Sequence, residues 1–253
     1  MTGSTSGIGR ATAERFGVQG AHVIAHGLPG SDEGVVTAVR RAGGECTLVL
    51  GDLRRAEDVR ALIVEASSVG GAIDVLVNNA GENVGVLDTA VAEWDACLEL
   101  DLRAAWLCAR EAARSMPRGA AIVTVSSNHA VSTLPGAFPY NVAKAGLLAL
   151  NQSLAVELAD RGIRSNAVVP GYVDTPINVA YFGAFADPGE ARQRAEALHP
   201  LRRLARPDEI AAAIEFLADE ATAGFITGTA LTVDGGRSAL LQDPDAAAAS
   251  SHR

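Results

Sequence analysis

Hydrophobic positions along the chain follow two alternating patterns, short apolar runs and longer stretches with helical spacing. The short runs are rich in valine and isoleucine and almost continuously apolar, as expected of strands covered on both faces. They occupy residues 21–25, 46–50, 73–77, 120–125, 163–169 and 230–233. The pattern therefore predicts six buried strands.

Helical spacing fills the intervals between these runs. The predicted helices span residues 10–18, 32–42, 56–69, 93–115, 137–160 and 207–218. Strands that alternate with helices indicate a parallel sheet with helices on both faces, joined by right-handed crossovers. We therefore predict an α/β fold with a doubly wound, Rossmann-like sheet, forming a single domain over residues 1–242. The low-complexity residues 243–253 are predicted to be a disordered tail.

One stretch, residues 176–206, interrupts the alternation. It is polar and partly helical, and prolines punctuate it at Pro176, Pro188 and Pro200. A long insertion near the end of a strand is more often functional than decorative. We interpret this stretch as a lid over a substrate site.

A glycine-rich turn at residues 2–9, TGSTSGIG, leads directly into the first predicted helix. Glycines permit a tight bend and let backbone N–H groups approach a pyrophosphate, and the helix N-terminus adds a partial positive charge. We expect the phosphates of a nucleotide to bind at Gly3, Ser6, Gly7, Ile8 and Gly9.

Such a turn normally follows a buried strand, and none precedes it in this sequence. In the expected strand order that strand is central, between the runs at 21–25 and 73–77. Without it, buried N–H and C=O groups lose partners at roughly 1–3 kcal/mol each, so several together rival a domain's net stability of about 5–15 kcal/mol. We therefore expect this chain to be a truncated or mis-started form of a longer protein that carries the first central strand.

Polar and small residues follow four of the predicted strands. They are Asp52-Leu53, Asn78-Asn79-Ala80-Gly81, Ser126-Ser127, and residues 170–175. Any one of these could be an ordinary turn, because such residues are common in turns. Ligands of open α/β sheets bind at the carboxyl ends of the strands, so together they indicate one shared site.

Tyr140 and Lys144 are four residues apart on a predicted helix, so their side chains lie on one face. A phenol ordinarily keeps its proton well above neutral pH, and a neighbouring ammonium stabilises the phenolate. Ser127 precedes them by a short loop and could hydrogen-bond a substrate oxygen beside the phenol. The three residues form a candidate acid–base site.

With these residues in place, the chain resembles the short-chain dehydrogenase/reductase family over nearly its whole length. The matching pieces are Thr2-Gly3-x-x-x-Gly7-Ile8-Gly9, Asn78-Asn79-Ala80-Gly81, Ser127, Tyr140-x-x-x-Lys144, Pro170-Gly171 with Thr175, and Val233-Asp234-Gly235-Gly236. The resemblance implies hydride transfer between a nicotinamide and a carbonyl or alcohol carbon. Tyr140 would exchange the proton, Ser127 would position the substrate oxygen, and Lys144 would hold the nicotinamide ribose.

The resemblance also implies a set of residues around the cofactor. Thr175 would contact the carboxamide, and residues 79–81 would pack against the adenosine side. The full set that we expect to contact the cofactor is Gly3, Ser6, Gly7, Ile8, Gly9, Asp52, Leu53, Asn79, Ala80, Gly81, Tyr140, Lys144, Pro170, Gly171, Val173 and Thr175.

One departure from the family pattern concerns the helix at 93–115. The family commonly has an asparagine where this chain has Asp101. That asparagine works largely by holding a water linked to the lysine, partly through its backbone carbonyl. Asp101 could keep the backbone role, and if ionised it would oppose the effect of Lys144 on Tyr140. Alternatively, it points elsewhere and is catalytically silent.

Cofactor preference depends on the end of the strand at 21–25. Family members that prefer NAD usually carry an acid there, and those that prefer NADP carry a nearby Arg or Lys. Residues 26–31, HGLPGS, have neither, and Asp32 and Glu33 follow. Two acids without a cation disfavour a 2′-phosphate, so NAD is expected and NADP is left open.

Several polar residues near the candidate site bear on the substrate. Glu82, Asn83 and His129 offer donors and acceptors around a carbonyl, which suits a sugar or another polyhydroxy compound. The insertion is also similar to that of sugar-dehydrogenase-like members of the family. The alternative is a 3-oxoacyl thioester reductase, whose acidic carrier protein needs a basic patch such as residues 202–206. A nucleotide-binding protein without turnover is a third interpretation, disfavoured by the presence of all three acid–base residues.

Composition limits the remaining partners. A formal charge of −9 without a basic stripe disfavours nucleic acid. No apolar run is long enough to span a membrane and no signal pattern opens the chain, so we expect a cytoplasmic protein. The three cysteines lack metal-ligand spacing, so we expect no metal. The long, alanine- and leucine-rich helices at 93–115 and 137–160 carry more apolar surface than one sheet face covers. With the resemblance, they indicate a homo-oligomer, a tetramer by expectation.

Overall fold

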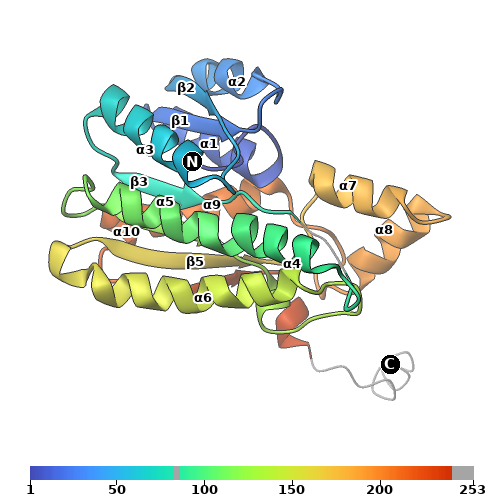
Figure 1. Cartoon of the computed structure of the whole chain (residues 1–253). Coiled ribbons are helices and arrows are strands. Elements are labelled where there is room, and N and C mark those ends of the chain that lie inside the picture. Colours follow the sequence, from blue (N-terminus) through green and yellow to red (C-terminus); the bar gives the residue numbers. More distant parts are fainter. Residues whose placement is uncertain (83–85, 241–253) are drawn as a thin grey trace.

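Two parallel sheets form the centre of the computed structural model, which describes residues 1–82 and 86–240 (Figure 1). In the smaller sheet, β1 (His22–Gly27) pairs with β2 (Glu45–Leu50). The larger sheet has the order β3 (Val75–Asn78), β4 (Ala121–Val125), β5 (Arg164–Pro170) and β6 (Ala230–Val233). The six predicted parallel strands are confirmed, and their ends lie within two residues of the predicted ones.

Residues 1–4 lie between the two sheets. The Thr2 N–H donates to the Val77 carbonyl on β3 (3.0 Å), and the Ser4 N–H donates to the His26 carbonyl on β1 (2.8 Å). The Met1 ammonium donates to the Ile24 carbonyl on β1 (2.8 Å). The start of the chain therefore bridges β1 and β3, the neighbours expected for a first central strand. That further strand, which would lie ahead of Thr2, stays a prediction.

Helices cover both faces of the sheets. One face carries α1 (Gly7–Val18), α2 (Gly34–Ala42), α9 (Pro207–Ala218) and the short α10 (Glu220–Ala223). The other face, in front in Figure 1, carries α3 (Ala56–Gly70), α4 (Val91–Leu98), α5 (Ala104–Ala113) and α6 (Tyr140–Glu157). The doubly wound, Rossmann-like α/β arrangement predicted from the sequence is confirmed.

Burial of the strands follows their position in the sheet. Every residue of β4 and β5 is buried, whereas residues of the edge strand β6 alternate between exposed and half-buried. Helix α9 shows how a covering helix forms. Pro207 occupies its first turn beside two acids that favour a helix N-terminus, and Ile210, Ile214 and Leu217 recur on its buried face. The continuously apolar strands are thus explained by helices on both sides.

The predicted helix at 93–115 is wrong in one respect. A π-helical turn, Glu99–Arg103, separates α4 from α5, and it carries Asp101 into the interior.

The stretch at 176–206 holds two helices, α7 (Pro176–Gly183) and α8 (Pro188–Ala197). The predicted tail at 243–253 lies outside the described residues. Within the described residues, no helix is both long and apolar enough to cross a membrane.

Candidate active site

The glycine-rich turn has a backbone that only glycine adopts easily. Gly3 and Gly7 have φ values of +59° and +53°, in the left-handed region. At Gly9, a Cβ would lie 2.1 Å from the Gly3 carbonyl oxygen and 2.7 Å from Nδ2 of Asn79. Helix α1 can therefore approach the turn closely only because position 9 lacks a side chain.

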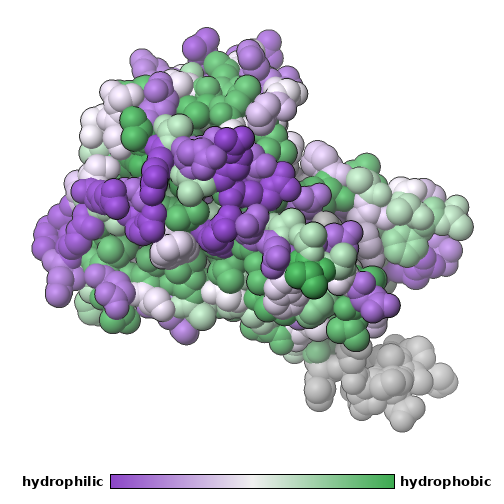
Figure 2. Space-filling view, in the orientation of Figure 1, coloured by the Kyte–Doolittle hydropathy of each residue, from purple (hydrophilic) through white to green (hydrophobic). Residues whose placement is uncertain are grey.

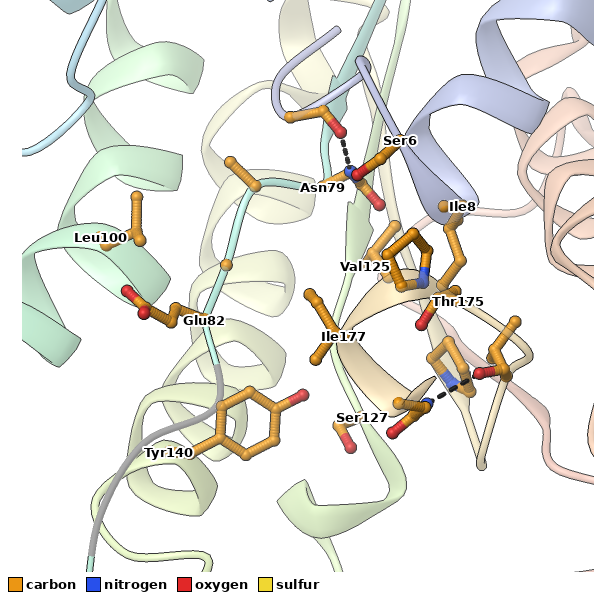
Figure 3. Close-up of a pocket in the computed structure, with 18 of the residues that line it drawn as sticks. Ser6, Ile8, Asn79, Glu82, Leu100, Val125, Ser127, Tyr140, Thr175 and Ile177 are labelled. Carbon is orange, nitrogen blue, oxygen red and sulfur yellow. Dashed lines mark hydrogen bonds between the residues drawn. The ribbon is translucent and has the colours of Figure 1, made fainter. Parts of the chain in front are cut away.

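A second turn, after β3, is tied to the glycine-rich one. Nδ2 of Asn79 donates to the carbonyls of Thr2 (3.1 Å) and Gly3 (2.9 Å, Figure 3). In return, Oγ1 of Thr2 accepts the N–H groups of Asn79 (2.9 Å) and Ala80 (3.1 Å). The Asn-Asn-Ala-Gly segment thus fixes the phosphate turn as well as lining the cleft. This role of Thr2 was not predicted.

His26, at the end of β1, is a site residue that sequence reasoning missed. Its Nδ1 accepts the Gly3 N–H (3.3 Å), which leaves Nε2 to donate to the Gly51 carbonyl (3.1 Å). Burial lowers the pKa of His26 to about 4, so the ring is neutral near pH 7. His26 therefore joins the glycine-rich turn to the end of β2 without adding charge. The only signal in the sequence is its place just before a strand-ending glycine.

One cleft at the carboxyl ends of the strands joins nearly all the residues expected to bind the cofactor. The cleft is lined by every residue of the expected cofactor set except Gly9. Gly9 packs behind the glycine-rich turn. Glu82, Ser127 and His129 line it too, whereas the expected substrate residue Asn83 lies outside the described residues. The four strand-end clusters therefore converge.

The phosphate end of this cleft fits a nicotinamide dinucleotide. Ser6 precedes α1 in an extended conformation and makes no side-chain cap to the first turn of that helix. The first-turn N–H groups and the partial positive charge of the helix end are thus available to a pyrophosphate. Thr175 packs against Gly7, where a Cβ would lie 3.2 Å from its Cγ2, so the start of the insertion reaches the turn.

Ser127, Tyr140 and Lys144 occupy the opposite end. Ser127 follows β4, and its Oγ accepts the His129 N–H (3.2 Å). Tyr140 is the first residue of α6 and lies beside Ser127 in the cleft (Figure 3). Nζ of Lys144 lies 5.2 Å from the centre of the Tyr140 ring. The one-turn spacing predicted from the sequence has brought a phenol and a buried ammonium together.

Asp101 lies behind these residues, with 1 % of its surface exposed. Its Oδ1 accepts the Glu82 N–H (2.8 Å), and the Cys97 thiol lies 3.8 Å from Oδ2. A Cβ on Gly81 would lie 2.6 Å from Oδ1 of Asp101 and 2.9 Å from Nζ of Lys144, so both charged groups converge on that glycine. Position 81 therefore admits only glycine without rearrangement.

The charges of this buried pair influence each other. Burial raises the pKa of Asp101, while Lys144 and the Glu82 N–H oppose that rise. Burial alone would lower the pKa of Lys144, but Asp101 and Tyr140 more than offset it and leave that pKa raised. Lys144 thus stays an ammonium throughout the neutral range. Within residues 1–82 and 86–240, no cluster of His, Cys, Asp or Glu could hold a metal.

The insertion at 176–206 is anchored at the rim of the cleft. Arg192 on α8 makes a bidentate pair with Asp174 (2.9 and 2.8 Å). Tyr172 packs against Phe182 (ring centres 5.9 Å apart), and its N–H donates to Nε2 of His199 (3.3 Å). Burial lowers the pKa of His199. Tyr172 belongs to the predicted cluster at 170–175 but was given no role of its own. Ile177 and Arg237, which also line the cleft, were not predicted.

Curated relatives match almost the entire chain. It is 39% identical to 3beta-hydroxysteroid dehydrogenase 1 of Eggerthella lenta (93% of this chain, 91% of the relative) and to cis-4-hydroxycyclohexanecarboxylate dehydrogenase of Sinomonas cyclohexanicum (95% and 96%). It is 32% identical to glucose 1-dehydrogenase 2 of Bacillus subtilis (93% and 92%).

Solved structures match it equally well. A putative short-chain dehydrogenase/reductase from Burkholderia xenovorans has a TM-score of 0.90 at 33% identity, covering 96% of both chains. A short chain dehydrogenase from Burkholderia cenocepacia in complex with NADP has a TM-score of 0.86 at 31% identity (94% and 96%).

The model of the enoyl-(acyl carrier protein) reductase family matches residues 3–238. Together with the relatives and the motifs in the cleft, this match shows the reaction class. The chain belongs to the short-chain dehydrogenase/reductase family and is an NAD(P)-dependent oxidoreductase that acts on CH–OH groups.

Proposed function

We propose that the protein interconverts a ring-borne secondary alcohol and its ketone, with Tyr140 as the acid–base group and NAD as the preferred cofactor. The observation that carries this proposal is the convergence of Ser127, Tyr140 and Lys144 at one end of a cleft whose other end is the glycine-rich turn. When bound, the nicotinamide supplies or accepts the hydride. The residues of the chain bind, orient and exchange the proton.

The three residues have different roles. Lys144, buried and charged, stabilises the Tyr140 phenolate from one helical turn away. The Oγ of Ser127 hydrogen-bonds the substrate oxygen beside the phenol. Oxidation moves the alcohol proton to Tyr140, and reduction returns it. We assign the nicotinamide ribose to Lys144 and Tyr140, and the carboxamide to Thr175.

Asp101 acts in this proposal as a positioning residue. Its carboxylate accepts the Glu82 N–H, which fixes the peptide between Gly81 and Glu82 beside Lys144. An ionised carboxylate also partly cancels the field of the Lys144 ammonium at Tyr140. Asp101 thereby limits the effect of the Lys144 charge on the acid–base group.

NAD is favoured by the charges at the end of β1. Gly27, Leu28 and Ser31 line the cleft there and carry no charge. Arg10, on α1, pairs with Glu14 (2.9 Å) and Asp32 (4.0 Å), and Arg54, which lines the cleft, pairs with Asp52 (2.6 Å). Among the described residues that line this end of the cleft, a 2′-phosphate would therefore find no uncompensated cation.

The substrate class is inferred from relatives and lining together. The three curated relatives are named for a hydroxysteroid, a hydroxycyclohexanecarboxylate and glucose, all of which contain rings. Tyr172 and Ile177 supply flat and apolar walls, and Glu82 and His129 supply polar contacts that suit a sugar. The thioester alternative is weaker, because two of the three arginines at residues 202–206 are paired with acids, Arg203 with Glu209 (2.7 Å) and Arg206 with Asp208 (3.0 Å).

A substrate panel tests the proposal. Cyclohexanols, hydroxysteroids, aldoses and 3-oxoacyl thioesters are assayed by nicotinamide absorbance with NAD and with NADP. We expect turnover of ring alcohols, with a higher kcat/KM for NAD. Turnover confined to thioesters would contradict the substrate class, and preference for NADP would contradict the cofactor assignment.

The homo-tetramer also stays a prediction. Hydrophobic residues lie along the α5–α6 face (Figure 2), where Trp106, Val142 and Val156 are 42 %, 38 % and 77 % exposed. Apolar surface of this kind is typical of subunit contacts. Light scattering tests it, because a single chain weighs 26.0 kDa.

We further propose that residues 1–242 form one domain with 176–206 as its lid. We also propose a cytoplasmic location for the protein. Its three cysteines, Cys46, Cys97 and Cys108, are buried and free, which suits a reducing compartment.

A further inference from the structure

Arg237, at the start of the short helix after β6, is a cation of the cleft that the acid–base site does not use. Two arginines line the cleft, and they differ in their partners. Arg54 pairs with Asp52 (2.6 Å), whereas Arg237 makes no salt bridge within residues 1–82 and 86–240. Asp234, three residues away, is occupied by the N–H groups of Gly236 (3.0 Å) and Ser238 (2.7 Å).

Neighbouring rings hold the Arg237 guanidinium at the substrate end. Its central carbon lies 4.9 Å from the centre of the Tyr172 ring. It is also near enough to His129 to help burial lower the pKa of that residue, so His129 adds no competing positive charge near pH 7. The His129 ring in turn packs edge-on to Tyr140, with centres 6.0 Å apart. A substrate held at Tyr140 would therefore extend past His129 towards Arg237.

We propose that Arg237 binds an anionic group, a carboxylate, on the ring substrate whose hydroxyl is held at Tyr140. A half-buried guanidinium that packs on an aromatic face and has no carboxylate partner in the part of the chain that the structure describes is suited to bidentate recognition of a carboxylate. The substrate class narrows to cyclic hydroxy acids and the corresponding oxo acids. The inference rests on the proposed function, because it takes Tyr140 as the reacting end.

The test compares two substrates that differ in charge, 4-hydroxycyclohexanecarboxylate and its methyl ester. For the unaltered protein we expect the acid to have the higher kcat/KM. Arg237→Gln should lower that preference by about 10–100-fold, through KM, as expected for a hydrogen bond to a charged group. Arg237→Lys should recover part of it. Arg41→Gln, an exposed arginine on α2, is the matched control and should change nothing.

Binding without turnover separates this inference from the proposed function. In Tyr140→Phe with NADH bound, calorimetry should detect the acid, and the added Arg237→Gln should weaken that binding by a similar factor. Equal use of acid and ester, unchanged by Arg237→Gln in a protein with an unaltered melting temperature, would overturn the anion site alone. Turnover that persists in Tyr140→Phe would instead overturn the proposed function.

Discussion

The two ends of the cleft are built from different kinds of contact. At the cofactor end, glycines and hydrogen bonds between side chains and backbone fix the turn. The side chains of Asn79 and Thr2 join two turns, and Gly9 lets α1 approach. At the substrate end, side chains from distant segments meet, with Tyr172 from the strand end, His129 from the short helix after β4, and Arg237 from beyond β6. The contacts at the cofactor end fix the shape of the phosphate-binding turn. The side chains at the substrate end determine which substrate binds, and they can change without altering that turn.

The strongest way to break this comparison is to add one carbon at the cofactor end. Gly9→Ala places a Cβ 2.1 Å from the Gly3 carbonyl, so the turn and α1 must separate. We expect NADH affinity, measured by fluorescence titration, to fall by about 5- to 150-fold, the range that an overpacking cost of about 1–3 kcal/mol gives. Gly183→Ala is the matched control, because a Cβ there meets nothing within 4 Å. Equal affinity in both variants would contradict a shape-determined phosphate site.

The same contrast explains what the sequence could predict. The glycine-rich turn, Asn79 and the Tyr140–Lys144 spacing are local patterns, and each predicts its own geometry. The bond from Asn79 to the turn and the bridge made by His26 join residues more than twenty positions apart, so no local pattern contains them. The π-helical turn was not predicted, because residues 99–103 continue the helical pattern of the sequence. What the pattern does not contain is the buried hydrogen bond from the Glu82 N–H to Asp101, nineteen positions away.

A smaller effect is expected at the substrate end, where the charge of Asp101 can be removed. Asp101→Asn keeps an oxygen for the Glu82 N–H but removes the negative charge beside Lys144. The ammonium then acts on Tyr140 unopposed, so the limb of the pH profile on which oxidation is lost as the pH falls should move to lower pH, by up to about 1 unit. Asp95→Asn, an exposed acid on α4, is the control and should leave the profile in place. An unchanged profile in Asp101→Asn would show that the carboxylate is catalytically silent.

The most direct test of the central claim is the turnover of Tyr140→Phe, measured on protein whose NADH affinity has been determined in the same preparation. The variant removes one oxygen at the substrate end and touches none of the contacts that hold the glycine-rich turn. The account predicts that NADH still binds, weakened by no more than the one ribose contact assigned to Tyr140, and that turnover is at least ~10²-fold lower, as for the loss of a general acid–base group. Near-normal turnover with intact cofactor binding would contradict it.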